Sequence, residues 1–391
     1  MIFDVSFLLR VGASVLLAAV LSFSMTPPVK HLAERVGAID VPKDGRRMHK
    51  TPIPRMGGLA IFIGFLVAAL IFMPRMDRAL WAILIGAALI VVLGMLDDRF
   101  TLPAKSKLVV QLAAAAILVF FGDLRIDRLT NPFGPSLYSY WDLGFWAYPI
   151  TIIWILAITN AVNFIDGLDG LACGVSGISS INLMIIALLV SNGQAAILMA
   201  ALTGACIGFL PHNFNPAKIF MGDTGSTFLG FMLAAVSVQG LFKAYTVISF
   251  LVPVLLLGLP IFDICFAVIR RIANGKSPME ADRGHIHHRL IDMGFSQKQS
   301  VAIAYVLTGI LGLAAVLLTV SGAVRTMIML SVILVVGAVG LHFILRTRPC
   351  HAALHSVEQD AAPEEKGEPP ENGECGQDPQ PSGADETDVR D

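Results

Sequence analysis

The sequence predicts an all-α polytopic membrane protein with about eleven transmembrane helices. Hydrophobic residues make up 55% of the 391-residue chain and charged residues only 15%, whereas soluble domains carry about 25% charged residues. Apolar runs recur along the chain, and about 20 apolar residues are enough for a helix to cross a bilayer. Because backbone polar groups must be paired inside lipid, these runs are expected to be helical.

The expected helices follow one another from the N-terminus to residue 345. They are expected at residues 5–25, 56–73, 79–96, 107–121, 145–162, 171–190, 195–211, 226–241, 246–269, 301–320 and 325–345. The segments 107–121 and 195–211 are short for a span. Gly204 and Gly208 in the seventh segment suit close contact between neighbouring helices.

Lys and Arg residues are unevenly divided between the two sets of loops that eleven spans would create. One set, counted with Lys107, Arg346 and Arg348 and without the acidic tail, holds 19 of them, and the other holds seven. Cytoplasmic loops are the ones enriched in Lys and Arg. We therefore expect the N-terminus outside and the C-terminus in the cytoplasm.

Two regions are predicted, a transmembrane domain at residues 1–348 and a disordered acidic tail at 349–391. The segment 356–391 carries twelve Asp or Glu against Lys366 and Arg390, a composition that cannot bury a core. The five cysteines form no CxxC pair, so neither a disulfide framework nor a thiolate metal site is expected. The N-terminus lacks an early basic residue and a cleavage site, which argues against a cleaved signal peptide.

Four polar clusters lie beside the apolar runs, after the third, fifth, seventh and ninth expected helices. They are Asp97-Asp98, Asn163-Phe-Ile-Asp166-Gly-Leu-Asp169, Phe220-Met-Gly-Asp223 and His285-Ile-His287-His288. Acids beside hydrocarbon are costly, so each is a functional hypothesis. The topology places all four on the cytoplasmic face, whereas a transporter would keep such groups near the midplane. This favours an enzyme that meets one soluble and one membrane-held substrate.

The acidic clusters have both functional and structural interpretations. Adjacent carboxylates at 97 and 98 repel each other unless a cation is present, so they suit a base and a metal contact; alternatively, a helix ends there with Asp98 paired to Arg99. The second cluster offers hard oxygen ligands of the kind that Mg2+ takes, or it is a polar turn. Asp223 could bind a metal, or it could cap the next helix.

The basic and histidine residues suit phosphate. His285, His287 and His288 lack the usual partners of a zinc set, and with Arg289 they look better as a phosphate-binding rim. The alternative is a basic loop on anionic lipid headgroups. Lys107 could hold a phosphate as well, or it could be an ordinary cytoplasmic lysine.

Together these motifs resemble the polyprenyl-phosphate N-acetylhexosamine-1-phosphate transferases over about residues 20–345. The resemblance rests on Arg55-Met-Gly-Gly58, Gly94-Met-Leu-Asp97-Asp98, Asn163-Phe-Ile-Asp166-Gly-Leu-Asp169-Gly, Phe220-Met-Gly-Asp223-Thr-Gly-Ser226, Pro260-Ile-Phe-Asp263 and His285-Ile-His287-His288-Arg289. The last motif is similar to the undecaprenyl-phosphate N-acetylglucosaminyl-1-phosphate branch, which starts O-antigen, common-antigen or teichoic-acid linkage units.

The resemblance implies an enzyme of the bacterial inner membrane with its active site on the cytoplasmic face. It would transfer a sugar 1-phosphate from a UDP-N-acetylhexosamine to undecaprenyl phosphate and release UMP. It implies Asp97 as the base, with Asp98 as its partner or in its place. Mg2+, or Mn2+ instead, would be held by Asp223 with Asn163 nearby. The implied substrate-binding residues are Lys107, Asp166, Asp169, Phe220, His285, His287, His288 and Arg289.

The expected partners are the two substrates and membrane lipids, with no nucleic acid and with a homodimer as one arrangement. Other UDP-sugar donors of the fucosamine, quinovosamine or muramoyl-pentapeptide type remain an alternative. A membrane transporter is the alternative from another class. A structural membrane scaffold would leave the four polar clusters without a role.

Overall fold

The computed structural model describes residues 4–41, 51–130, 140–240, 251–273 and 286–320, and the account below refers to these residues. The helices are α1 (Val5–Val36), α2 (Gly58–Phe72), α3 (Arg78–Phe100), α4 (Ala104–Ala116), α5 (Ala147–Phe164), α6 (Leu171–Leu189), α7 (Gly193–Asn213), α8 (Gly222–Gly240), α9 (Leu251–Leu256), α10 (Gly258–Ala273), α11 (Ile286–Asp292) and α12 (Gln297–Val320). A π-helical turn, η1 (Ile117–Phe121), extends α4, and a 3₁₀ turn, η2 (Gly144–Trp146), precedes α5.

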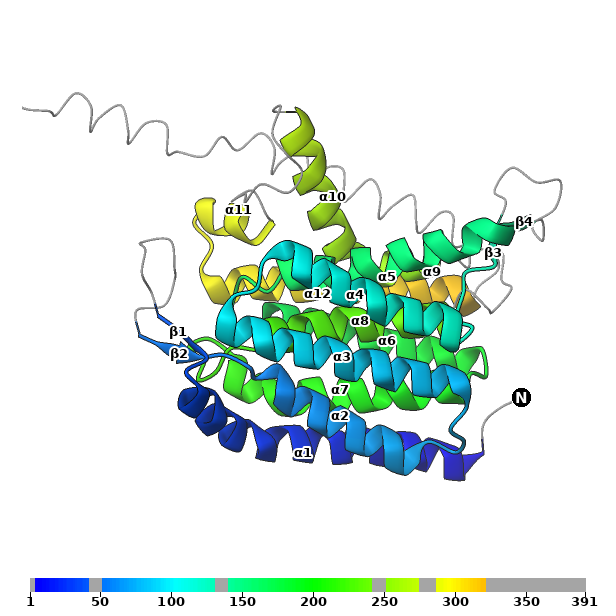
Figure 1. Ribbon diagram of the computed structural model, residues 1–391, viewed down its shortest axis with the longest axis horizontal. Coiled ribbons are helices and arrows are strands. Elements are labelled where there is room, and N and C mark those ends of the chain that lie inside the picture. Colours follow the sequence, from blue (N-terminus) through cyan, green and yellow to red (C-terminus); the bar gives the residue numbers. More distant parts are fainter. Residues whose placement is uncertain (1–3, 42–50, 131–139, 241–250, 274–285, 321–391) are drawn as a thin grey trace, which may run out of the picture. The chain divides into compact units, whose positions relative to one another are not determined.

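The described residues confirm a mostly helical polytopic membrane protein. Seven helical segments are long and apolar enough to cross a membrane: α1, α3, α4 with η1, η2 with α5, α6, α7 and α12. Figure 1 shows most of the long helices lying side by side in a bundle. The expected span at 325–345 and the predicted tail at 349–391 lie outside the described residues.

Two short antiparallel hairpins add to the helices that were predicted. β1 (Ile39–Asp40) pairs with β2 (Ile53–Pro54), and β3 (Arg128–Thr130) pairs with β4 (Tyr140–Asp142). Strands of two or three residues are too short to show the alternating pattern by which a strand is recognised. The expectation of a purely helical chain therefore missed them.

Helix α1 is longer than predicted. It runs to Val36 through Pro27 and Pro28, where a helix end was expected. Gly37 ends it in the left-handed conformation, with φ of 72°, and its N–H donates to the carbonyls of Ala33 and Glu34. This is the helix end that glycine favours.

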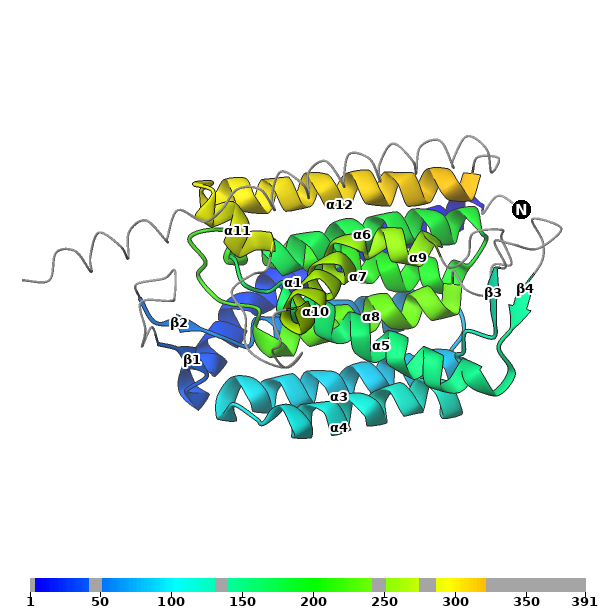
Figure 2. The same ribbon diagram turned by 90° about the horizontal axis from the view of Figure 1, so that it is seen from above.

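The segment predicted as one span at 246–269 is two helices in the structure. α9 ends at Leu256 and α10 begins at Gly258. Pro260 has no N–H to give the carbonyl four residues earlier, at Leu256, and its ring would crowd that carbonyl. The single-helix prediction was therefore wrong, and Figures 1 and 2 show α10 running at a steep angle to the other helices.

Helix α8 lies inside the bundle, where α3, α5, α6, α2 and α7 contact it. Every residue from Thr224 to Gly240 is buried. Glycines allow the close approach: a Cβ on Gly230 would lie 2.8 Å from Thr159 Cα on α5. At the α1–α7 contact, a Cβ on Gly204 or Gly208 would lie 2.1 Å from a carbonyl oxygen of α1, so the predicted close contact at these two glycines is confirmed.

The direction of the helices brings several of the predicted polar positions to one end of the bundle, where β1, β2 and α11 also lie (left in Figure 1). α3 and α5 end there, and α8 begins there, and hydrogen bonds join these three helix ends. The expectation that the acidic clusters share one end is thus met for Asp97-Asp98, Asn163 and Asp223.

Candidate active site

The first turn of α8 is held by the carboxylate of Asp98. The backbone N–H groups of Asp223 and Thr224 donate to Asp98 Oδ1 at 2.9 Å and Oδ2 at 3.1 Å, and Thr224 Oγ1 donates to Oδ2 at 2.6 Å. The first N–H groups of a helix have no partner within the helix. Asp98, from the end of α3, therefore caps α8 from a distant part of the sequence.

Gly222 makes this contact possible. Its φ of 69° lies in the left-handed region, and a Cβ there would lie 2.3 Å from Asp98 Oδ2. A side chain would therefore both strain the backbone and displace the carboxylate. This accounts for the glycine that precedes Asp223.

Backbone pairing fixes the residues just before α8. The N–H groups of Gly57 and Gly58 donate to the carbonyls of Phe220 and Met221, each at 2.9 Å, and the Phe220 N–H donates to Pro54 O at 2.9 Å. A Cβ on Gly58 would lie 2.1 Å from Gly225 Cα. The sequence analysis assigned no role to the Arg55-Met-Gly-Gly58 motif. In the structure, this motif binds the segment that carries Phe220 and Asp223.

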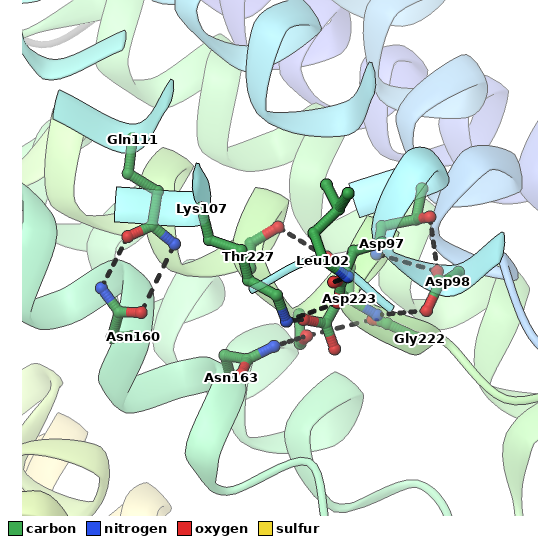
Figure 3. Close-up of polar contacts among 12 residues, drawn as sticks. Asp97, Asp98, Leu102, Lys107, Gln111, Asn160, Asn163, Gly222, Asp223 and Thr227 are labelled. Carbon is green, nitrogen blue, oxygen red and sulfur yellow. Dashed lines mark hydrogen bonds and ion pairs between the residues drawn. The ribbon is translucent and has the colours of Figure 1, made fainter. Parts of the chain in front are cut away.

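A lysine lies between two carboxylates at the centre of the site. Lys107 Nζ on α4 lies 2.5 Å from Asp97 Oδ2 and 2.8 Å from Asp223 Oδ2 (Figure 3). The other oxygen of Asp97 accepts the N–H of Leu102 at 2.7 Å. One ammonium group is thus shared by carboxylates from α3 and α8, and its three N–H donors let it bind both.

Asn163 reaches the same turn of α8 from the end of α5. Its amide Nδ2 donates to Ser226 Oγ at 2.8 Å, and Ser226 Oγ donates to Gly222 O at 3.0 Å. About one turn away from Asn163 and Lys107, Asn160 and Gln111 exchange two hydrogen bonds, at 2.8 and 3.4 Å (Figure 3). The sequence analysis missed this amide pair, although its spacing of three and four residues from Asn163 and Lys107 indicates a shared helix face.

Asp166 follows α5 with its carboxyl deep among protein atoms, although part of its surface remains accessible. Burial and the negative charges of Asp223 and Asp98 raise the pKa of Asp166 to about 8, while Arg55 opposes the shift. Arg55 also pairs with Asp40, with Nη2 at 3.3 Å from Oδ2. Arg55 is therefore a cation close to Asp166, a role that the sequence analysis had not assigned to it.

Asp169 has a structural function that the sequence did not reveal. Its Oδ2 accepts hydrogen bonds from Asn215 Nδ2 at 2.9 Å and from the Ala217 N–H at 3.1 Å. At the next residue, Gly170 receives the Tyr305 hydroxyl at its carbonyl, at 2.6 Å. Asp169 thus holds the loop between α7 and α8, and a direct nucleotide contact stays a prediction.

Only part of the histidine motif lies among the described residues. His285 and the side chains of His287 and His288 lie outside the described residues, and residues 286–292 form α11. The Ile286 N–H donates to Asp263 Oδ1 at 2.8 Å, and the Arg289 guanidinium lies 4.7 Å from the centre of the Phe266 ring. Asp263 and Phe266, one turn apart on α10, therefore hold α11.

The donor set fits a divalent cation that is shared with substrate. Asp97 and Asp223 already direct oxygens at one cationic group, and Mg2+ usually takes one or two carboxylates together with phosphate oxygens and water. Among the described residues, no three His, Cys, Asp or Glu side chains form a closed metal cage. Such a site would accept an ion whose remaining ligands come from the substrate.

The structure thus gathers five of the predicted site residues in one network: Asp97, Asp98, Lys107, Asn163 and Asp223. Phe220 is joined to it through the backbone, and Asp166 through its charge. Chemically, the network offers a carboxylate beside an ammonium group, and the partial positive charge at the N-terminus of α8 is already met by the Asp98 carboxylate.

Comparison with known proteins gives consistent matches. The sequence model of glycosyl transferase family 4 matches residues 80–241. A Bacillus subtilis protein named probable undecaprenyl-phosphate N-acetylglucosaminyl 1-phosphate transferase is 42% identical over 80% of this chain and 86% of its own length. A Mycobacterium tuberculosis decaprenyl-phosphate N-acetylglucosaminephosphotransferase is 36% identical, covering 77% and 80%. The Escherichia coli K12 undecaprenyl-phosphate alpha-N-acetylglucosaminyl 1-phosphate transferase is 29% identical, covering 77% and 82%.

Proposed function

The chain belongs to glycosyl transferase family 4, and we propose that it transfers N-acetylglucosamine 1-phosphate from UDP-N-acetylglucosamine to undecaprenyl phosphate, with release of UMP. The relatives named above carry this chemistry in their names. The observation in the structure that supports it is the Lys107 ammonium group bound between Asp97 and Asp223. That arrangement places positive charge and a basic oxygen together at one end of the bundle.

The reaction brings two anions together. An oxygen of the lipid phosphate attacks the β-phosphorus of the donor, a new P–O bond forms, and the bond to the UMP oxygen breaks. Unscreened, the two phosphates would repel each other strongly. Lys107 supplies positive charge at this point, the kind of preorganised electrostatic stabilisation that dominates such transfers.

Asp97 is the proposed base. Its Oδ2 lies 2.5 Å from Lys107 Nζ, and its other oxygen is fixed by the Leu102 N–H. When the lipid phosphate binds Lys107 in place of Asp97, Asp97 Oδ2 becomes free to accept the remaining proton of that phosphate. Base and phosphate-binding cation would therefore act as one unit.

Mg2+, or Mn2+ in its place, would be held by Asp223 with Asn163 nearby, and when bound it would neutralise charge on the pyrophosphate. Phe220, Asp166 and Asp169 would bind the nucleotide, and Arg289 with the histidine motif would bind phosphate. The charge asymmetry of the loops supports a cytoplasmic active site in a bacterial inner membrane, with the N-terminus outside.

A transporter is the less favoured function. Transport sites lie near the bilayer midplane, whereas the network here lies where α3 and α5 end and α8 begins. Asp263, the acid that the sequence places inside an expected helix, accepts a hydrogen bond from α11. Among the described residues, the acids of the network thus lie at helix ends, and Asp263 is engaged by α11.

The proposal is tested with purified protein, undecaprenyl phosphate, Mg2+ and a panel of UDP-sugars. We expect UMP release with UDP-N-acetylglucosamine and a lipid product whose mass is that of undecaprenyl pyrophosphate carrying one N-acetylglucosamine. Asp223→Asn should lower kcat about 10²- to 10³-fold, whereas Asp142→Asn, at an exposed acid of β4, should not. A product mass that matches another sugar would reassign the donor, and equal activity of the two variants would overturn the assignment of Asp223.

A further inference from the structure

We propose that Asp98 is a positioning residue, which fixes the first turn of α8 so that Asp223 faces Lys107 and Asp97, and that it neither takes the proton nor binds the metal. The inference rests on the proposed function. It separates two adjacent aspartates that look equivalent in the sequence and that were expected to share one chemical role.

The first argument is that both oxygens of Asp98 are already bound. Three donors, two N–H groups and one hydroxyl, converge on this carboxylate at 2.6 to 3.1 Å. The residue is 7% exposed and Thr224 is fully buried. A carboxylate must expose an oxygen to act as a base toward a substrate, and this one is enclosed by the start of α8.

The second argument comes from helix geometry. Successive residues on a helix point about 100° apart, so the side chains of residues 97 and 98 leave the end of α3 in different directions. Asp97 directs an oxygen at Lys107, while Asp98 faces the backbone of α8 (Figure 3). The division of labour between them thus follows from their positions on the helix.

The third argument is that Asp98 binds the backbone of Asp223 itself. The hydrogen bond runs from the Asp223 N–H to Asp98 Oδ1, and the Asp223 side chain then reaches Lys107 Nζ at 2.8 Å. One turn before Asp98 on α3, Gly94 lies against the same turn of α8, where a Cβ would be 2.4 Å from Thr224 Cα. A weaker clamp would therefore let the metal-binding carboxylate move.

The role of Thr224 provides a test that leaves every charge in place. Thr224→Val removes one hydroxyl donor to Asp98, and Thr224→Ser keeps it. Because a hydrogen bond to a charged group is involved, we expect Thr224→Val to lower kcat about 10- to 100-fold. We also expect it to raise the Mg2+ concentration needed for half-maximal activity, and Thr224→Ser to restore both quantities.

Asp98→Asn completes the experiment as a double-mutant cycle. We expect Asp98→Asn and Thr224→Val to weaken the same clamp, so that the double variant loses less activity than the product of the two single losses. The acid limb of the pH–rate profile should persist in all variants that fold, because Asp97 is intact. Should Asp98→Asn fail to fold, the Thr224→Val and Thr224→Ser pair still decides the question.

Two outcomes would overturn the proposal. If Thr224→Val keeps the kcat and Mg2+ requirement of the wild type while folded Asp98→Asn is inactive, Asp98 acts directly. If Thr224→Val lowers the unfolding temperature but changes neither kinetic quantity, the contact only stabilises the fold. Absence of UMP release by the wild type with every donor would instead contradict the proposed function, and is recognised separately.

Discussion

Replacing Lys107 by methionine tests the electrostatic balance of the site most directly. The change keeps most of the side-chain length but removes the ammonium group that binds Asp97 and Asp223 at 2.5 and 2.8 Å. The two carboxylates would then face each other without a countercharge. We expect the variant to be less stable than the wild type when Mg2+ is absent.

The size of the effect follows from the exposure of the three groups. The side chains of Lys107, Asp97 and Asp223 are 29%, 8% and 26% exposed. Breaking a buried ion pair costs about 3–5 kcal/mol, and an exposed pair contributes about 0–1 kcal/mol. For this partly exposed arrangement we expect a loss of about 2 kcal/mol, which lies between the two ranges, and a fall in unfolding temperature of about 2–3 °C for a chain of this length.

The assay is thermal unfolding of the purified protein in detergent, with and without Mg2+. Because a divalent cation can occupy the position of the lost ammonium group, Mg2+ should recover much of the stability of Lys107→Met and change that of the wild type less. Lys105→Met, at an exposed lysine two residues earlier on α4, is the matched control. Equal unfolding temperatures for Lys107→Met and the wild type, unaffected by Mg2+, would refute the reasoning.

Three further changes test other parts of the site. The pKa of Asp166 in the folded protein is raised from 3.8 to about 8. The protonated side chain therefore contributes its full share of the unfolding free energy below pH 3.8, and this share is lost as the pH rises through about 8. Asp166→Asn should therefore flatten the fall in unfolding free energy of the ligand-free protein between pH 5 and 8, by at most about 1.4 kcal/mol per pH unit; an unchanged slope would contradict this. Gly94→Ala would place a Cβ 2.4 Å from Thr224 Cα, so activity should fall at least 10-fold, whereas Gly12→Ala, where the space is open, should be silent in the same UMP assay. Asp263→Asn weakens the anchor of α11 at Ile286 and should raise the donor KM more than it lowers kcat; an unaltered KM would separate α11 from substrate binding.

The pattern of residues determined much of the bundle and of the network. Apolar length located the helices because a bilayer leaves the backbone no other structure over so many residues. Polar groups beside those runs marked Asp97, Asn163 and Asp223, because acids and amides near hydrocarbon need a partner or a function. Pro260 could have indicated the break between α9 and α10 at Leu257, but a hydropathy average over the whole segment does not detect it.

The partner of each polar group was decided only by the tertiary structure. In sequence, Asp97 and Asp98 are two adjacent acids, and Asp166 and Asp169 repeat the same Asp-Gly step. In space, Asp98 caps α8 from 125 residues away, and Asp169 ties the loop before α8. The sequence indicates which groups need a hydrogen bond or a countercharge, whereas the packing of distant helices determines which group supplies it. That packing thereby also determines which carboxylates remain available to a substrate.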